Sequence, residues 1–252
     1  MKKLDERLSS AQRTLAVLQT LSTAGRAMSL AELAQAMDLP KATVHRLCAQ
    51  LLADGWVSRD VDERAFSTGP ALRRLALDTM QHDDLRGMRH QVLADLVAEV
   101  GETCNFTTLD GSRVLYLDRV EAPWPLRLTL EVGAHVPLHC TASGKLFLAT
   151  LPRARRDALL KHLQLPSLTP HTLTGKDQLR KECEAIVRRG YSTDREEFVA
   201  GLGAVAVPVR DGQGEVRAAV ALHAPTMRLP LEGLRRHVPA LERAARRMES
   251  LL

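Results

Sequence analysis

The chain has 252 residues, 45% hydrophobic and 26% charged, which is ordinary for a globular protein and sufficient for two modest domains. Its net charge is +5, and residues 1–90 carry only +2 of this, so charge alone does not locate a nucleic-acid site. Aromatic residues make up 3% of the chain, which argues against a stacking platform for single-stranded nucleic acid.

Three helices are predicted in the first 57 residues. The first covers residues 10–24, and its expected buried stripe is Ala11, Leu15, Leu18 and Leu21. Ser29 and Glu32 form the S-x-x-E capping box that starts the second helix. This helix breaks at residues 38–40, and the third begins near Pro40, because proline suits the first turn of a helix.

The third helix has two contrasting faces. The apolar face, spaced i, i+3, i+4, i+7 and i+8, consists of Val44, Leu47, Cys48, Leu51 and Leu52. The opposite face is polar and basic, and consists of Lys41, Thr43, His45, Arg46 and Gln50. Such a face can simply meet water, or it can contact a partner.

A two-stranded hairpin is predicted after the third helix, with "GWVSRD" and "AFST" on either side of the turn "VDER". Together these elements predict a winged helix-turn-helix, whose third helix has the diameter to enter a DNA major groove. The expected contacts with double-stranded DNA are Ser29, Lys41, Thr43, His45, Arg46, Gln50 and, in the wing, Arg64. The alternative is a winged helix that binds another protein.

The remainder of the chain predicts helices and antiparallel strands, and the whole is an α+β protein. Helices are expected at residues 69–80, 84–100, 141–151 and 177–189 and from about residue 231, with Thr141 or Ser143 capping the third of these. Strands are expected at residues 103–109, 113–120, 126–132, 204–210 and 216–224. The Asp110-Gly111 turn is a strong hairpin signal, because this pair accepts positive φ.

Enzymatic motifs are missing from the sequence. "HCTASGK" ends like a phosphate-binding loop, but His139 and Leu146 stand where that loop needs a glycine and a hydroxyl. Neither G-x-S-x-G nor H-E-x-x-H occurs. Asp194, Glu196 and Glu197 are interpreted as a solvated or hinge-like charge run rather than a catalytic carboxylate pair. We therefore expect a protein that is not an enzyme.

A metal site is not expected either, and no cofactor is predicted. His139, Cys140, His223 and Cys104 are suitable zinc ligands, but they lack the close spacing of a zinc site. The four cysteines form no CxxC, the N-terminus lacks the apolar core of a secretory signal, and no apolar run approaches the ~18 residues of a membrane span. We expect a cytoplasmic protein with reduced thiols and no membrane partner.

Several segments resemble the IclR family of bacterial transcriptional regulators. They include "SLAELAQAMDLPKATVHRLCAQLLADGWV", "FSTGPALRRLAL", "GETCNFTTLDGSRVLYLDRVEAPWPLRL", "VGAHVPLHCTASGKLFLATLP" and "VAVPVRDGQGEV", and the resemblance runs from about residue 10 to residue 248. It implies a winged helix-turn-helix (residues 1–69), a dimerising linker helix (70–83) and a GAF-like effector-binding domain with an antiparallel sheet (84–252). Such proteins are dimers or tetramers that repress or activate nearby catabolic operons.

The resemblance also implies an effector site. It is expected to include Thr141, Ala142, Ser143, Asp194, Ala204, Ala221 and His223. The start of the helix at residues 141–144 suits a carboxylate, although an ordinary N-cap needs no ligand. Because Ala204 is apolar and His223 replaces a smaller residue of some relatives, we expect an aromatic or longer-chain organic acid rather than a very small polar one.

Overall fold

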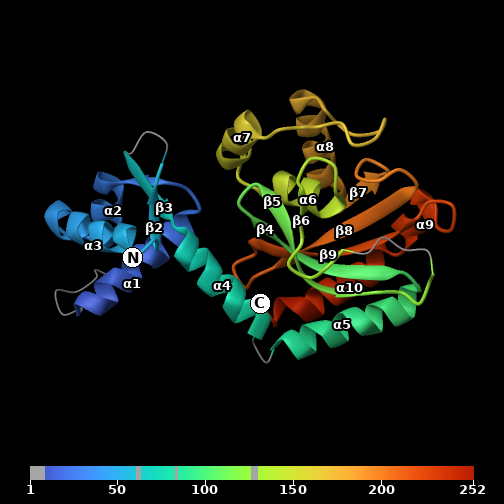
Figure 1. Cartoon of the computed structure of the whole chain (residues 1–252), viewed down its shortest axis with the longest axis horizontal. Coiled ribbons are helices and arrows are strands. Elements are labelled where there is room, and N and C mark those ends of the chain that lie inside the picture. The colour runs from blue at the N-terminus through green and yellow to red at the C-terminus, as the bar shows by residue number, and fades with distance from the viewer. Residues whose placement is uncertain (1–8, 61–63, 83–84, 126–129) are drawn as a thin grey trace. The chain divides into compact units, whose positions relative to one another are not determined.

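The computed structural model describes residues 9–60, 64–82, 85–125 and 130–252. The chain divides into two compact units, residues 1–82 and 83–252, which are considered separately below (Figure 1).

The N-terminal unit contains three helices, a small sheet and a fourth helix. The helices are α1 (Ser10–Ala24), α2 (Leu30–Met37), α3 (Lys41–Ala53) and α4 (Pro70–His82). The strands β1 (Met28–Ser29), β2 (Val57–Arg59) and β3 (Ala65–Thr68) lie in the order β1-β3-β2. The predicted hairpin is confirmed, although the middle of its turn, residues 61–63, lies outside the described residues. The two-residue strand β1 was not predicted.

The predicted capping box starts α2. The Ser29 hydroxyl accepts a hydrogen bond from the Glu32 amide at 3.3 Å, and the Glu32 carboxylate accepts one from the Ser29 amide at 2.7 Å. These bonds, with help from Arg26, lower the pKa of Glu32 to about 2. The helix ends at Asp38, which has φ 52°, so the break before Pro40 is also confirmed.

The predicted buried stripe of α1 is wrong at its N-terminal end. Ala11 is exposed and Leu15 is 65% exposed, whereas Val17 and Leu21 are buried. The face that packs on the unit is Thr14, Val17, Leu18 and Leu21, an i, i+3, i+4, i+7 set rotated from the predicted one. Leucine spacing alone did not reveal this, because both sets share Leu18 and Leu21.

The second unit is built on a six-stranded antiparallel sheet in the order β6-β5-β4-β9-β8-β7. The strands are β4 (Thr103–Asp110), β5 (Arg113–Val120), β6 (His135–Pro137), β7 (Ser192–Arg195), β8 (Leu202–Arg210) and β9 (Val216–Pro225). The helices are α5 (Leu85–Val100), α6 (Ala142–Thr150), α7 (Arg153–His162), α8 (Lys176–Arg189), α9 (Leu231–Arg236) and α10 (Val238–Glu249). Helices α6 and α8 lie on one face of the sheet and α5 and α10 on the other (Figure 1).

Three predictions for this unit need correction. Residues 126–129 of the expected strand at 126–132 lie outside the described residues, and residues 130–132 are not in a strand. The C-terminal helix is two helices, because the chain breaks at His237 and restarts with Pro239 in the first turn of α10. The elements α7, β6 and β7 were not predicted, since they are short or lack a clear apolar period.

Helix α6 begins where the backbone leaves no room for a side chain. The Thr141 hydroxyl caps the helix by accepting a hydrogen bond from the Gly144 amide at 3.1 Å, which decides between the two predicted caps. A Cβ on Gly144 would lie 2.6 Å from Thr141 Oγ1 and closer still to the Leu138 backbone. Glycine at this position therefore sets how closely α6 approaches the segment before it.

The substitution Gly144→Ala is expected to lower the free energy of unfolding by about 2 kcal/mol or more, because the added carbon meets backbone that cannot move aside. The matched control is Gly87→Ala in α5, where an added Cβ meets nothing within 4 Å. It should raise stability by about 0.5–1 kcal/mol, as alanine does in a helix. Urea unfolding of both variants tests this, and equal effects would contradict it.

Candidate functional site

The polar face predicted for α3 is exposed. Lys41, His45, Arg46 and Gln50 are exposed and Thr43 is half-buried, whereas Val44, Leu47, Cys48 and Leu51 are buried. Leu52, expected on the buried face, is only half-buried. The helix therefore has one face that completes the core of the N-terminal unit and one that is open to a partner.

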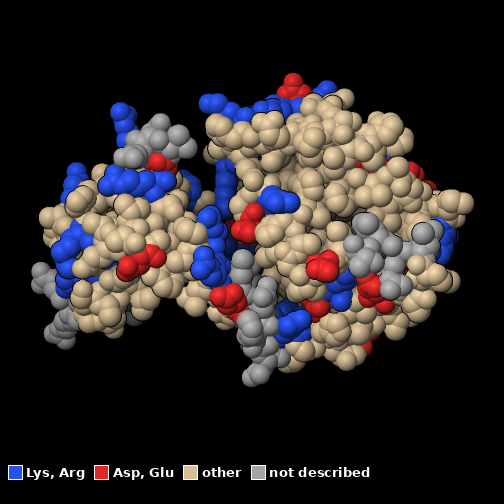
Figure 2. All heavy atoms as spheres, in the orientation of Figure 1, with Lys and Arg blue, Asp and Glu red and all other residues tan. Residues whose placement is uncertain are grey.

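The two remaining residues predicted to contact DNA have different surroundings. Ser29 is half-buried and its hydroxyl and amide are engaged in the capping box. Arg64 is exposed, and its amide donates to Asp60 Oδ1 at 2.9 Å, which supports the chain as it enters β3. Figure 2 shows basic side chains spread over the visible face of this unit, with few acidic ones among them.

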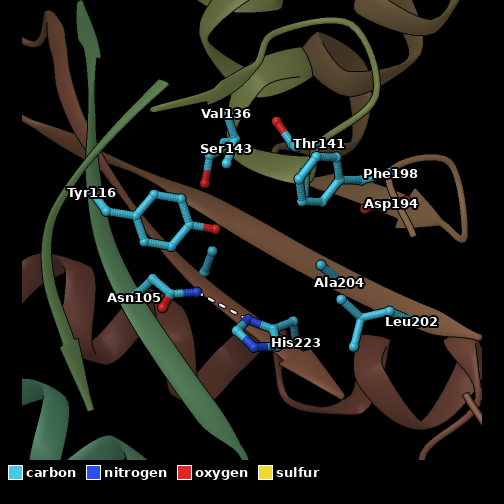
Figure 3. A pocket seen from close by; sticks show the side chains of 12 residues that line it. Asn105, Tyr116, Val136, Thr141, Ser143, Asp194, Phe198, Leu202, Ala204 and His223 are labelled. Atoms are coloured by element: carbon cyan, nitrogen blue, oxygen red, sulfur yellow. Dashed lines mark hydrogen bonds between the residues drawn. The ribbon is translucent and has the colours of Figure 1, made fainter. Parts of the chain in front are cut away.

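A cavity lies in the second unit between the sheet and the start of α6 (Figure 3). All seven residues predicted for the effector site line it, and the space is partly open to solvent. Five further residues complete the lining: Asn105, Tyr116, Val136, Phe198 and Leu202. The structure thus brings together residues from all six strands of the sheet, from the start of α6 and from the loop after β7.

The upper wall of the cavity offers hydrogen-bond donors. The amides of Ala142 and Ser143 stand in the first turn of α6, where helix geometry leaves them without intrahelical partners. The hydroxyls of Ser143 and Tyr116 point into the same space, although these residues are only 6% and 8% exposed (Figure 3). Neither hydroxyl has a hydrogen-bond partner in the described part of the chain. Burial raises the pKa of Tyr116 to about 12, so its hydroxyl keeps its proton.

Asp194 is the carboxylic acid of the cavity. It was predicted to be solvated, but it is buried. It is 3% exposed, and burial raises its pKa to about 7, against the opposing effect of the Lys145 ammonium. One of its oxygens accepts a hydrogen bond from the Glu197 amide at 2.7 Å. Near neutral pH this residue therefore exists in both charged and neutral forms.

Glu197 is buried too, which corrects the interpretation of residues 194–197 as a solvated charge run. Its carboxylate forms an ion pair with Lys145 on α6, and both side chains are at least 95% buried. A pair this deep is costly to break, because either partner alone would be an uncompensated charge. The pair was not predicted, because 52 residues separate its two members in the sequence.

Asn105 and Tyr116 were also missed by sequence analysis. Both lie on strands that were correctly predicted, β4 and β5, and Asn105 is 1% exposed. The polar side chains on these two strands were the available signal, but only the sheet order reveals which of them share a cavity.

Thiols and possible metal ligands are dispersed. No group of three or more His, Cys, Asp or Glu side chains within the described ranges is arranged to hold a metal ion. His139 instead bonds through Nε2 to the Pro166 carbonyl oxygen at 3.0 Å. All four cysteines are buried and free, and burial raises the pKa of Cys48 and Cys183 to about 11 and that of Cys140 to about 12. In the same ranges, no helix combines the length and apolarity that crossing a bilayer requires.

Comparison with known proteins shows similarity over both units. Residues 10–61 match the IclR helix-turn-helix domain, and residues 77–250 match the C-terminal domain of the bacterial transcriptional regulator IclR. The chain is 41% identical over 239 residues, 95% of each chain, to a protein of Cupriavidus necator named "Probable transcriptional regulator SauR".

Two solved structures share the fold. The Thermotoga maritima IclR is 26% identical with a TM-score of 0.64, covering 96% of this chain and 97% of its own. An IclR homologue of Microbacterium hydrocarbonoxydans complexed with 4-hydroxybenzoate is 26% identical with a TM-score of 0.62, covering 97% and 99%.

The raised pKa of Asp194 predicts a pH-dependent stability. The unfolded chain loses this proton near the ordinary pKa of 3.8 and the folded chain only near 7, so the residue destabilises the fold progressively across that interval and by a constant amount above it. Between pH 5 and pH 7 the advantage of Asp194→Asn over the parent chain should grow by on the order of 2 kcal/mol. Urea unfolding at several pH values measures this.

The exposed Asp177 on α8 provides the control, because Asp177→Asn removes a carboxylate whose side chain is 89% exposed. Its effect on stability should stay nearly constant over the same interval. A pH-independent difference for Asp194→Asn would show that the folded carboxyl is already ionised at pH 5.

Proposed function

The chain belongs to the IclR family of bacterial transcriptional regulators, with a DNA-binding helix-turn-helix domain and a C-terminal effector domain, and from this premise we propose a division of roles between α3 and the cavity. Helix α3 reads a double-stranded operator beside a catabolic operon, and a small organic acid or aromatic acid bound in the cavity controls that binding. The observation that carries the proposal is the convergence of Thr141, Ala142, Ser143, Asp194, Ala204, Ala221 and His223 on one cavity.

The proposed DNA contacts follow from the exposed face of α3. Arg46 and Lys41 carry charges that suit phosphate oxygens or guanine edges, and His45 and Gln50 can hydrogen-bond to base edges. Thr43 is placed to touch a thymine methyl or a phosphate, while Ser29 and Arg64 would contact the backbone at the flanks. The helix presents its N-terminal residues, as recognition helices of this class do.

The proposed effector is an acid with an apolar body. The α6 amides and the Ser143 and Tyr116 hydroxyls suit its carboxylate, and Val136, Phe198 and Leu202 suit an aromatic or alkyl part. The similar protein complexed with 4-hydroxybenzoate supports this ligand class. We propose no catalysis at the cavity, since the relatives are transcriptional regulators.

We further propose a homodimer or homotetramer that acts in the cytoplasm on palindromic half-sites. Helix α4 leaves Leu75 52% exposed, which suits a helix that packs against its copy. The effector would act by binding one arrangement of the domains more tightly than the other, because only a difference in affinity shifts such an equilibrium. Whether it represses or activates depends on the operator.

Operator binding tests the role of α3. Arg46→Ala should weaken binding to DNA from beside the protein's own gene about 5- to 100-fold, because a charged contact to base or phosphate is lost. Arg236→Ala, which removes an equal charge from an exposed position on α9, should leave the affinity within twofold. Gel-shift titrations at two salt concentrations with nonspecific competitor measure both.

The contrary outcome is that the parent chain binds DNA from beside its own gene no better than random DNA, and that a pool of genomic fragments with effector candidates present gives the same result. That outcome would favour the alternative of a winged helix that binds another protein.

Ligand binding tests the cavity. Tyr116→Phe removes one hydroxyl that has no partner among the described residues, so the fold should be unaffected while affinity for a bound acid falls about tenfold. Thermal shift across aromatic and alkyl monocarboxylates, starting with 4-hydroxybenzoate, identifies the ligand, and calorimetry compares the variants. Tyr191→Phe serves as the control, because Tyr191 does not line the cavity. Stabilisation by metals or sugars alone would overturn the proposal.

A further inference from the structure

A chain of hydrogen bonds forms the floor of the cavity and continues beyond it. Arg119 Nη1 donates to Asn105 Oδ1 at 3.1 Å, and Asn105 Nδ2 lies 3.0 Å from His223 Nδ1. Asn105 and His223 line the cavity (Figure 3), whereas Arg119 is not among its lining residues. This series of hydrogen bonds crosses three neighbouring strands, β5, β4 and β9. Arg119 lies directly opposite Asn105 in the β4–β5 register.

Arg119 fixes which groups donate and which accept in this series of hydrogen bonds. A guanidinium group contains only donors, so Asn105 must turn its oxygen toward Arg119. The amide nitrogen of Asn105 then faces His223 and donates, which makes His223 Nδ1 an acceptor. An accepting ring nitrogen has no proton, and the neutral ring therefore holds its proton on Nε2.

We propose that Arg119 is a positioning residue for the effector cavity, which fixes the direction of the Asn105 amide and thereby holds His223 as a neutral imidazole protonated on Nε2. Protonation of His223 would place an N–H against the Asn105 amide donor, so the charged form is opposed by geometry. The role in ligand recognition rests on the proposed function, whereas the state of His223 is a property of the unliganded protein.

Within the described part of the chain, the charged groups around His223 do not reverse this argument. Arg119 on β5 opposes a second positive charge nearby, and Glu121, which accepts from Arg119 Nε at 3.1 Å, reduces that effect. Asp194 on β7 lies opposite Ala204 on β8, which lies opposite His223 on β9. The backbones of Asp194 and His223 are therefore two strand spacings, about 10 Å, apart. Five ion pairs lie on or beside the other elements packed against β9: Lys145 with Glu197, Glu102 with Arg228, Glu232 with Arg235, Arg243 with Glu99 and Arg247 with Asp95. The other charged side chains of α9 and α10 are exposed to solvent, namely Arg236, Glu242, Arg246 and Glu249.

The consequence for recognition is that no described side chain in the lining of the cavity is a cation. The described lining residues include no Lys or Arg, and a neutral His223 adds no positive charge. A ligand anion would then depend on the α6 amides and the hydroxyls, beside a carboxyl group at Asp194. Such a cavity suits a monoacid and disfavours a ligand with two or more negative charges.

Histidine ring nitrogens report the state of His223 directly. The full-length chain labelled with nitrogen-15 in its nine histidines is measured by NMR without ligand between pH 6 and pH 8, and the signals lost in His223→Gln assign the residue. We expect a protonated Nε2 and an unprotonated Nδ1 throughout that range. A protonated Nδ1, or a change of charge within the range, would overturn the proposal.

Two substitutions test the cause. Asn105→Asp keeps the acceptor for Arg119 but replaces the donor facing His223 by an acceptor, so Nδ1 should become protonated and His223 should titrate at a higher pH than in the parent chain. Arg119→Met removes the fixed donor, and we expect a mixture of the two tautomers, whereas Arg119→Lys should restore the Nε2 form. An unchanged tautomer in Asn105→Asp, or in a folded Arg119→Met, would show that Arg119 has no positioning role.

The outcomes are separable from those for the effector. If no acid binds while the tautomers respond as expected, the proposed effector function fails and the assignment of Arg119 stands. If acids bind but His223 carries its proton on Nδ1, the assignment fails and the effector function stands.

Discussion

The antiparallel register of β7, β8, β9 and β4 is the constraint on which the candidate site depends. It places Asp194, Ala204 and His223 in one row across three strands, and it brings Asn105 diagonally beside His223. Because side chains alternate along a strand, a slip of one residue would turn each of these groups to the opposite face of the sheet. Two alanines on the same face, Ala204 in this row and Ala221 opposite Asn105, leave the space that the larger side chains around them enclose. Pairing of backbone groups thus creates both the cavity and its chemistry.

Burial then decides what these groups can do. The Lys145–Glu197 pair ties α6 to the loop after β7, and its charges compensate each other, so Asp194 remains as the carboxyl with no ion-pair partner of its own in the described structure. This arrangement explains why its pKa rises despite the ammonium nearby: desolvation exceeds the attraction that Lys145 already shares with Glu197. On the other side of the cavity Arg119 acts through Asn105 without touching the space. The polar groups of the site are therefore held by neighbours that a ligand would not contact.

Much of this fold could be predicted from local patterns, and the failures have identifiable causes. The capping box at Ser29, the break at Pro40 and the Asp110-Gly111 hairpin depend on backbone chemistry within a few residues, and all three are confirmed. The buried face of α1 was wrong because two overlapping apolar sets fit the same helix. Strand β7 was missed because "STDR" is polar, and its burial comes from α6 and β8 rather than from its own composition. The effector residues were assembled by resemblance, whereas Asn105, Tyr116, Lys145 and Arg119 required the sheet order.

The two proposed sites differ in the kind of interaction they use, and so they should respond to different conditions. The charged side chains on the polar face of α3 are exposed, and their attraction to phosphates is screened by salt. The cavity contains buried groups that salt reaches weakly, but its Asp194 exchanges a proton near neutral pH while His223, in the proposed tautomer, does not. An anion entering beside Asp194 binds best when that carboxyl is protonated, because two adjacent negative charges in a buried site repel. Binding of an acid would then be coupled to uptake of one proton, so that acidic conditions would favour the liganded protein even at a fixed ligand concentration.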